Sequence, residues 1–173
     1  MKLGEINSLF KNLSKVIKNP RSDLKYKNKF TLLVSVVLSA QCTDVNVNNV
    51  TKNIYPKYNN PWHFVKLGRK KIEKIIKSIG LFRNKAKSVY LLSKQLIEKH
   101  NGKVPKNFDD LLALPGVGRK TANVVLNEGF GLPAIAVDTH IFRVSNRTGL
   151  APGKNPYQVE QTLYKVVPKK YLK

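Results

Sequence analysis

Apolar and polar residues recur with helical spacing along most of the chain. In residues 3–18 apolar side chains return every three or four positions, which predicts an amphipathic helix that Asn19 and Pro20 end. Residues 30–40 (FTLLVSVVLSA) are apolar nearly all round. We expect a helix buried within a domain there, because no partner strand is apparent. A long amphipathic helix is predicted for residues 83–100.

The same spacing predicts several shorter helices, separated by segments rich in turn residues. They cover about 44–54, 61–66, 69–78, 109–113, 119–127, 138–148 and 157–166. Asp138 is predicted to cap the helix that follows it, with Ile141, Val144 and Ser145 on its inner face. No convincing strand, repeat or heptad is found, so the sequence predicts an all-α fold.

Residues 107–127 (NFDDLLALPGVGRKTANVVLN) join two of these helices through a very short turn. Such a pair is a helix-hairpin-helix, a relative of other helical hairpins. Gly116 and Gly118 flank Val117 in the turn, and glycine lets the backbone adopt positive φ or approach a partner closely. The turn ends at a helix N-terminus, which suits an anion such as phosphate.

Lys120 lies on the first turn of the second helix, where a cation is disfavoured by the helix dipole. The helix N-terminus, neighbouring Arg119 and partial burial would all favour the neutral amine over the ammonium. A neutral lysine attacks carbon electrophiles and forms Schiff bases. A lysine that contacts phosphate is the alternative, and local chemistry leaves both open.

Asp138 follows Lys120 by eighteen residues, across a glycine-rich loop that could let one helix end face the other. Its carboxylate could orient the amine, shuttle protons or stabilise a developing positive charge. A plain helix cap is the alternative, and both roles are compatible.

Gln41 and Leu81 each lie in a turn between predicted helices, within SAQCTD and SIGLF. Chemistry on a base in duplex DNA requires that base to leave the stack, and amide or apolar side chains can fill the gap. The alternatives are a core position for Leu81 and a helix cap or solvated polar residue for Gln41.

The chain has 32 Lys and Arg against 10 Asp and Glu, a net charge of +22. This charge indicates a polyanionic partner, although translation of an AT-rich genome would also enrich lysine. No secretory signal is visible, and the longest apolar stretch is too short to span a membrane. We therefore expect an intracellular protein with no membrane contact. A single cysteine, Cys42, excludes an intramolecular disulfide framework, a cysteine-rich zinc site and an all-cysteine iron–sulfur cluster.

Four segments together resemble endonuclease III, the bifunctional DNA glycosylase and abasic-site lyase of base excision repair. They are LLVSVVLSAQCTD (32–44), KSIGLFRNKAKSV (77–89), LPGVGRKTANVVL (114–126) and VDTHIFRVSNRTGL (137–150). The resemblance covers essentially the whole chain. It implies the helix-hairpin-helix DNA glycosylase fold, with two helical lobes flanking a DNA-binding cleft. One lobe would comprise residues 22–132, and the other residues 1–21 plus 133–173.

The resemblance also implies roles for individual residues. Lys120 would attack the anomeric carbon of the sugar, displace the damaged base and form a Schiff base, after which elimination cuts the strand. Asp138 would be the catalytic carboxylate, and Gln41 and Leu81 would fill the gap left by the flipped nucleotide. Further DNA contacts are expected in the hairpin, from Gly116, Val117, Gly118, Arg119 and Thr121.

The implied substrate is damaged double-stranded DNA with oxidised pyrimidines or abasic sites. We expect a monomer located in the cytoplasm with the nucleoid. Two alternatives stay open: a non-catalytic DNA-binding remnant of such an enzyme, and a monofunctional DNA glycosylase. Lys120 argues against the second, because related adenine glycosylases lack a lysine at its position.

Members of the family usually continue into a further helix and four cysteines that hold a [4Fe–4S] cluster. This chain ends before that segment and contains only Cys42. We therefore expect no cluster, and no metal in the chemistry. The second lobe would lose packing partners, leaving Leu9, Leu13 and Ile17 of the first helix exposed. A truncated gene product, one part of a split protein and a variant without the cluster all fit.

Overall fold

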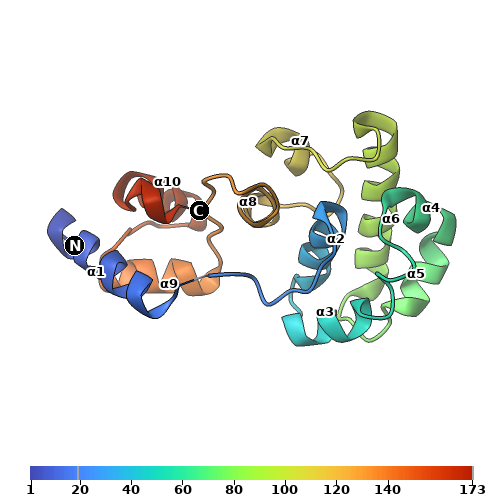
Figure 1. Cartoon of the computed structure of the whole chain (residues 1–173), viewed down its shortest axis with the longest axis horizontal. Coiled ribbons are helices and arrows are strands. Elements are labelled where there is room, and N and C mark those ends of the chain that lie inside the picture. The colour runs from blue at the N-terminus through green and yellow to red at the C-terminus, as the bar shows by residue number, and fades with distance from the viewer. Residues whose placement is uncertain (19, 173) are drawn as a thin grey trace. The chain divides into compact units, whose positions relative to one another are not determined.

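The computed structural model describes residues 1–18 and 20–172, and within them every regular element is helical (Figure 1). This confirms the all-α prediction. The predicted end of the first helix at Asn19 lies outside the described residues. The elements are α1 (Leu3–Val16), α2 (Lys29–Ser39), α3 (Asp44–Thr51), α4 (Pro61–Leu67), α5 (Arg69–Ile75), α6 (Phe82–His100), α7 (Phe108–Leu112), α8 (Arg119–Val124), η1 (Val125–Gly129), α9 (Thr139–Thr148), α10 (Pro156–Val166) and η2 (Lys169–Tyr171).

The chain forms two compact units. One comprises Ser22–Phe130 and is called the hairpin unit, because it contains α7 and α8. The other combines Met1–Arg21 with Gly131–Lys173 and is called the terminal unit.

The hairpin unit is built around α2, whose residues from Phe30 to Leu38 are all buried. The predicted buried helix is thus confirmed. Helices α3, α6 and α8 pack against it (Figure 1). Its buried hydroxyl groups are paired: Ser35 shares a 2.6 Å hydrogen bond with Tyr55, and the Tyr55 hydroxyl donates to the Thr31 carbonyl at 3.0 Å. Burial raises the pKa of Tyr55.

The second helix of the hairpin is longer than the sequence predicted, and its end is not α-helical. Helix α8 passes directly into η1, a π-helical turn that extends to Gly129. A π turn holds more residues than an α turn, and the adjacent Val125 and Leu126 are both buried here. A side chain at Gly129 would begin 3.1 Å from Leu32 of α2, so this end of the helix packs tightly.

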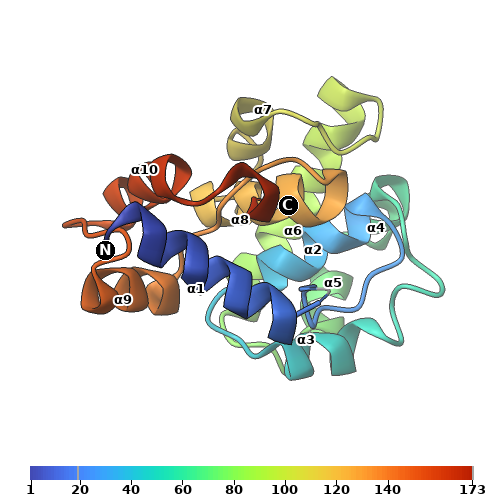
Figure 2. The same ribbon diagram turned by 60° about the vertical axis from the view of Figure 1, so that its left-hand side comes forward.

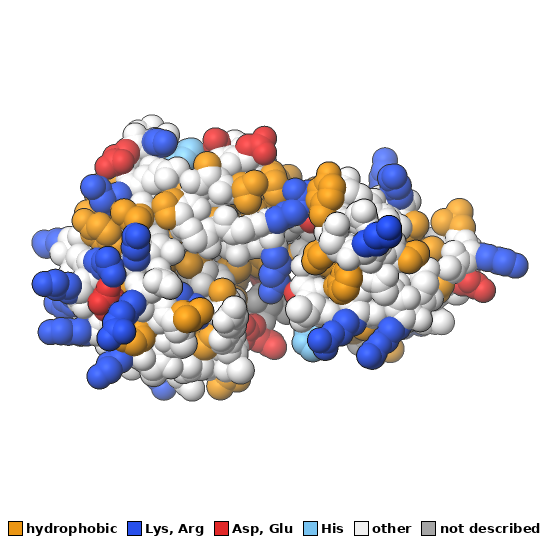
Figure 3. All heavy atoms as spheres, turned by 180° about the vertical axis from the view of Figure 1, so that it is seen from behind, with side chains coloured by type: hydrophobic (Ala, Val, Ile, Leu, Met, Phe, Trp, Pro, Cys, Tyr) orange, Lys and Arg blue, Asp and Glu red, His pale blue; other side chains and the backbone are white. Residues whose placement is uncertain are grey.

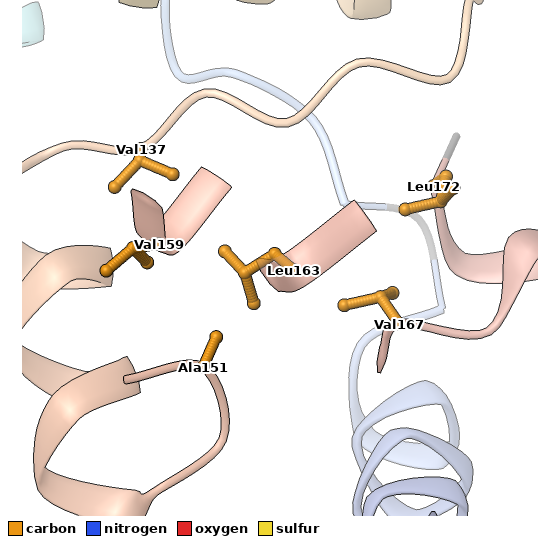
Figure 4. Packing of buried hydrophobic residues seen from close by; sticks show 6 residues of the cluster. All are labelled: Val137, Ala151, Val159, Leu163, Val167 and Leu172. Carbon is orange, nitrogen blue, oxygen red and sulfur yellow. The ribbon is translucent and has the colours of Figure 1, made fainter. Parts of the chain in front are cut away.

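The terminal unit has a core of its own, in which Val137, Ala151 and α10 meet (Figure 4). One cluster of buried hydrophobic residues in this core comprises Val137, Ala151, Val159, Leu163, Val167 and Leu172. Helix α1 lies beside α9 and α10 (Figure 2). The Met1 amino group donates to the Gly149 carbonyl at 2.9 Å, and the Phe10 and Tyr171 rings stack with centroids 5.4 Å apart.

Helix α1 covers this core with only part of its surface. Leu13 and Ile17 are exposed, as the sequence predicted, whereas Leu9 is half-buried. In α9 the predicted inner face is partly wrong, since Ile141 and Val144 are exposed. Ser145 is buried as predicted, and Phe142, which was not predicted, contacts the core cluster.

Candidate functional site

The turn of the hairpin is seated on α2 and α6 through Gly116. This glycine has φ = +80°, and a Cβ atom there would lie 2.6 Å from Ser88 Cβ and 3.5 Å from Val37. Only glycine meets both conditions. Val117 is buried, and its N–H donates to the Leu114 carbonyl at 3.1 Å, so its side chain has a packing role in the turn.

Gly118 differs from Gly116 in its backbone conformation and in the space around it. Its φ is −97°, which any residue can adopt, and a Cβ atom there would meet nothing within 4 Å. As the N-cap of α8 it supplies no side-chain acceptor to the first turn. In several other helices an asparagine, threonine or aspartate provides that acceptor, as Asn107 does for α7. Because no other part of the protein lies against Gly118 on this side, its backbone is open to an external anion.

Lys120, next along the first turn of α8, has an exposed side chain. The sequence predicted partial burial, and the structure corrects this. Arg119 packs against the hairpin itself, with its guanidinium 4.7 Å from the centre of the Phe108 ring. Thr121 is half-buried. Lys120 is therefore the hairpin cation that reaches solvent beside the open backbone of Gly118.

Gln41 and Leu81 both have left-handed backbones, with φ of 53° and 58°. Such a conformation costs a non-glycine residue about 1–2 kcal/mol. Both side chains are exposed, Leu81 to 58%. A core role for Leu81 is thereby excluded. A capping role for Gln41 is also excluded, because the Thr43 hydroxyl accepts from the Asn46 N–H at the start of α3.

The structure holds these two turns together through a residue that sequence reasoning missed. The Asn46 side-chain amide donates to the Ser78 carbonyl at 3.1 Å and to the Cys42 sulfur at 3.4 Å. A Cβ atom on Gly80 would lie 3.9 Å from the Gln41 carbonyl oxygen. The sequence carries no signal for Asn46 beyond its place one helical turn after Cys42.

The hairpin turn and these two turns belong to the same end of the α2 and α6 pair. Gly116 meets Val37, which precedes Gln41 by four residues, and Ser88, which follows Leu81 by seven. Seven residues of α-helix span about 10 Å. The hairpin unit by itself therefore gathers an open backbone, an exposed lysine and two strained, exposed side chains.

Asp138 lies in the terminal unit, as the N-cap of α9. Its Oδ1 accepts hydrogen bonds from the N–H groups of His140 at 3.0 Å and Ile141 at 2.9 Å. The predicted cap is confirmed. Within the described residues no protein donor contacts the other carboxylate oxygen, so the cap leaves one oxygen for chemistry.

Basic side chains are spread over the surface, and they outnumber acidic ones on the face shown in Figure 3. Exposed i,i+4 ion pairs join Arg69 to Glu73 and Lys94 to Glu98. Even if each of the 10 acidic residues paired with one basic residue, most of the 32 Lys and Arg would have no acidic counterpart. The surface is therefore suited to a polyanion.

Cys42 is half-buried in the turn that carries Gln41, and it is the only cysteine of the chain. A [4Fe–4S] cluster takes four cysteine ligands, so this donor set does not fit the cluster that the family resemblance implies. Among residues 1–18 and 20–172 no three His, Cys, Asp or Glu side chains are grouped closely enough to hold a metal ion.

Comparison with known proteins decides the family. Residues 34–169 match the HhH-GPD superfamily of base excision DNA repair proteins. Endonuclease III of Rickettsia conorii is 52% identical over 96% of this chain and 80% of its own length. Endonuclease III of Escherichia coli K12 is 53% identical over 88% of this chain and 72% of its own length. The chain belongs to the endonuclease III family.

Solved structures support this assignment. A trapped covalent intermediate of endonuclease III with DNA superposes on this endonuclease III family member with a TM-score of 0.92 and 46% identity, over 98% of this chain and 80% of that one. A thermostable thymine-DNA glycosylase, at 24% identity and a TM-score of 0.75, shares the fold. Base excision DNA glycosylase with abasic-site lyase activity is accordingly the enzyme class. None of the described helices has the length and apolar character needed to cross a membrane.

Proposed function

We propose that the protein excises oxidised pyrimidines from double-stranded DNA and cleaves the strand at abasic sites through Lys120. The observation that carries this proposal is the exposure of Lys120 beside the open Gly118 backbone, in a unit that also presents Gln41 and Leu81. The DNA complexes of its endonuclease III relative support a DNA substrate.

The chemistry requires one nucleophile and one carboxylate. The neutral Lys120 amine attacks the anomeric carbon of the sugar, the glycosidic bond breaks, and the damaged base leaves with a proton. The C1′–O4′ bond then breaks, O4′ takes up the second amine proton, and the opened sugar is left as a Schiff base with the lysine. A proton then leaves C2′ and the C3′–O3′ bond breaks, and water finally releases the lysine. Asp138, with one oxygen outside its helix cap, is the proton-transferring or charge-stabilising group.

Binding and base removal use the remaining residues of the hairpin unit. The backbone of Gly116 and Gly118, with the first turn of α8, grips a phosphate. Arg119 and Thr121 border that contact, while Val117 supports the turn from within. Gln41 and Leu81 fill the gap left by the flipped nucleotide, as exposed side chains on turns do in other proteins that unstack DNA.

We further propose that no cluster or metal held by the chain's own residues takes part, since the chemistry above needs only an amine and a carboxylate. The protein would act as a monomer on damaged duplex DNA. Its place of action would be the cytoplasm, with the nucleoid.

Borohydride trapping tests the proposal. Incubated with abasic duplex DNA and sodium borohydride, the wild-type protein is expected to form a covalent complex, and Lys120→Ala is expected to form none. Lys106→Ala, which removes an exposed lysine outside the hairpin, should trap like the wild type. Lys120→Ala should still bind abasic duplex in a gel-shift assay, because the phosphate contacts remain.

Failure to trap by a wild-type protein that binds DNA well would contradict the enzyme proposal. A non-catalytic DNA-binding protein would also bind abasic and intact duplex equally, with a steep loss of affinity as salt rises. A monofunctional glycosylase would release damaged bases without ever forming the covalent complex.

A further inference from the structure

One lysine of the hairpin unit is buried and plays no part in the chemistry above. Lys85 is 5% exposed, in a chain whose lysines are otherwise mostly on the surface. Its Nζ atom is fully buried and has no hydrogen-bond partner in the described structure. Native proteins rarely leave a buried polar atom unpaired, and such an atom requires an explanation.

Lys85 is connected to both of the strained turns. Its backbone N–H donates to the Leu81 carbonyl at 3.1 Å, so it continues the turn that carries Leu81. Its amine lies within electrostatic reach of Cys42, the residue after Gln41. Burial lowers the pKa of Lys85, and the electrostatic interaction with Cys42 opposes that effect. Lys85 therefore follows the Leu81 turn in the chain and interacts electrostatically with the residue next to Gln41.

An unpaired buried amine makes the free protein less stable than it would be with an acceptor nearby. A carbonyl oxygen brought to Nζ would therefore offset part of this cost. The Gln41 turn, residues 39–42, contains Cys42 itself. Its carbonyl groups are therefore candidates to accept a hydrogen bond from the Lys85 amine. Gln41 in this turn and Leu81 in the other both have strained left-handed backbones, and Asn46 links the two turns.

We propose that Lys85 is a positioning residue that couples the Gln41 and Leu81 turns when their side chains enter DNA. As Gln41 and Leu81 insert, the Gln41 turn shifts and its carbonyl groups accept hydrogen bonds from the Lys85 amine. This gain is available only in the inserted state, so it shifts the population toward insertion. The coupling rests on the proposed function, because it requires a gap in duplex DNA to be filled.

The coupling distinguishes damaged from intact DNA. An intact duplex offers no gap, and a single strand has no opposite base to displace. Lys85 should therefore strengthen binding to abasic duplex without affecting either of the other two. A lysine needed only for folding would act on all three alike.

Lys85→Met tests this, because methionine has similar length but cannot donate a hydrogen bond. The probe is a duplex with a tetrahydrofuran abasic analogue opposite 2-aminopurine, whose fluorescence reports displacement of the opposite base. At saturating protein the fluorescence change should be several-fold smaller for Lys85→Met than for the wild type. Affinity for this duplex should fall about tenfold, the effect of losing one hydrogen bond from a charged donor.

Three measurements serve as controls. Affinity for intact duplex, and borohydride trapping on a single-stranded abasic oligonucleotide, should stay within twofold of the wild-type values. Lys87→Ala, two residues along α6 and exposed, should behave as the wild type in every assay. Lys85→Arg, which keeps the donor, should restore at least part of the fluorescence change.

Wild-type trapping is established first, so that failure of the proposed function is separate from failure of the coupling. If Lys85→Met gives the same fluorescence change as the wild-type protein, the proposed coupling is wrong. Equal losses on abasic duplex, intact duplex and single strand would overturn it as well. If thermal denaturation shows that Lys85→Met does not fold, Lys85→Leu replaces it, with the same expected pattern because leucine also lacks a hydrogen-bond donor.

Discussion

The side-chain amide of Asn46 donates a 3.1 Å hydrogen bond to the backbone carbonyl of Ser78, thirty-two residues away in the chain. Through this bond, the first turn of α3 fixes the turn that ends in Leu81. The same amide also donates to the Cys42 sulfur, which neighbours Gln41. The two residues proposed to fill the DNA gap thus share one support.

Asn46→Ala should loosen both turns. We expect the free energy of unfolding to fall by about 1 kcal/mol, the usual value of a hydrogen bond. Affinity for abasic duplex should fall more than affinity for intact duplex, because only the former requires Gln41 and Leu81 to be held in place. Asn49→Ala, an exposed asparagine on the same helix, is the matched control. If both variants bind abasic duplex equally well, Asn46 does not support the turns in this way.

The two glycines of the hairpin turn should respond oppositely to alanine. Gly116→Ala combines a positive φ with a clash against Ser88, so the free energy of unfolding should fall by about 2–4 kcal/mol. Gly118→Ala introduces neither strain nor a clash, and stability should stay constant or rise by up to about 1 kcal/mol.

Gly118→Ala should also weaken DNA binding, although it leaves stability intact. The methyl group of Gly118→Ala would stand where the phosphate approaches, so affinity for duplex DNA should fall about tenfold in a protein of full stability. Chemical denaturation and gel-shift titration provide the two readouts. Unchanged affinity in Gly118→Ala would show that phosphate does not approach this stretch of backbone.

Asp138 combines a helix cap with a free carboxylate oxygen, and two substitutions separate these roles. Asn can still accept hydrogen bonds from His140 and Ile141, so Asp138→Asn should keep its stability within about 0.5 kcal/mol. Its trapping rate should nevertheless fall about 10²- to 10⁴-fold. Asp138→Ala should lose the rate and also about 1 kcal/mol of stability. If Asp138→Asn traps DNA at the wild-type rate, Asp138 serves only as a helix cap.

The buried Lys85 should make stability depend on pH. Its pKa in the folded protein lies below the ordinary 10.5. Below the folded value both states hold the proton, and the full cost of burying the charge is present. As pH rises from there toward 10.5 the folded state releases its proton first, so the unfolded state binds more protons and stability rises.

Lys85→Met removes this cost and should raise the free energy of unfolding at pH 7 by about 1–3 kcal/mol. Its advantage over the wild type should shrink as pH approaches 10. Denaturant titrations between about pH 7 and pH 10 suit the test, because the raised pKa of Tyr55 reduces stability only above its ordinary value of 10.0. An advantage independent of pH would contradict a buried, charged amine.

Features that depend on neighbouring residues were predictable from the sequence. The buried α2 follows from a continuous apolar run, and the cap at Asp138 follows from a side chain that precedes a helix. The hairpin likewise follows from two glycines between helical segments. In each case the signal and the structure it predicts lie within a few residues of one another.

Features that depend on distant parts of the chain were not predictable. Lys85 is one lysine among several on an amphipathic helix, and its burial results from how α6 packs in the folded unit. The bond from Asn46 to Ser78 joins separate turns. Exposure of Ile141 and Val144 reflects which side of α9 faces the terminal core, and helical spacing alone cannot distinguish the sides of so short a helix. The pattern of apolar residues does not distinguish the π turn of η1 from an ordinary α-helical turn.

The left-handed backbones of Gln41 and Leu81 lower the stability of the protein at the two positions that are proposed to serve DNA repair. Glycine at either position would relieve about 1 kcal/mol of strain and would also delete a side chain proposed to enter DNA. A directed-evolution screen for heat resistance alone would therefore enrich Gln41→Gly and Leu81→Gly. Such a screen would produce proteins with higher thermal stability that bind damaged DNA less well, unless repair activity were selected at the same time.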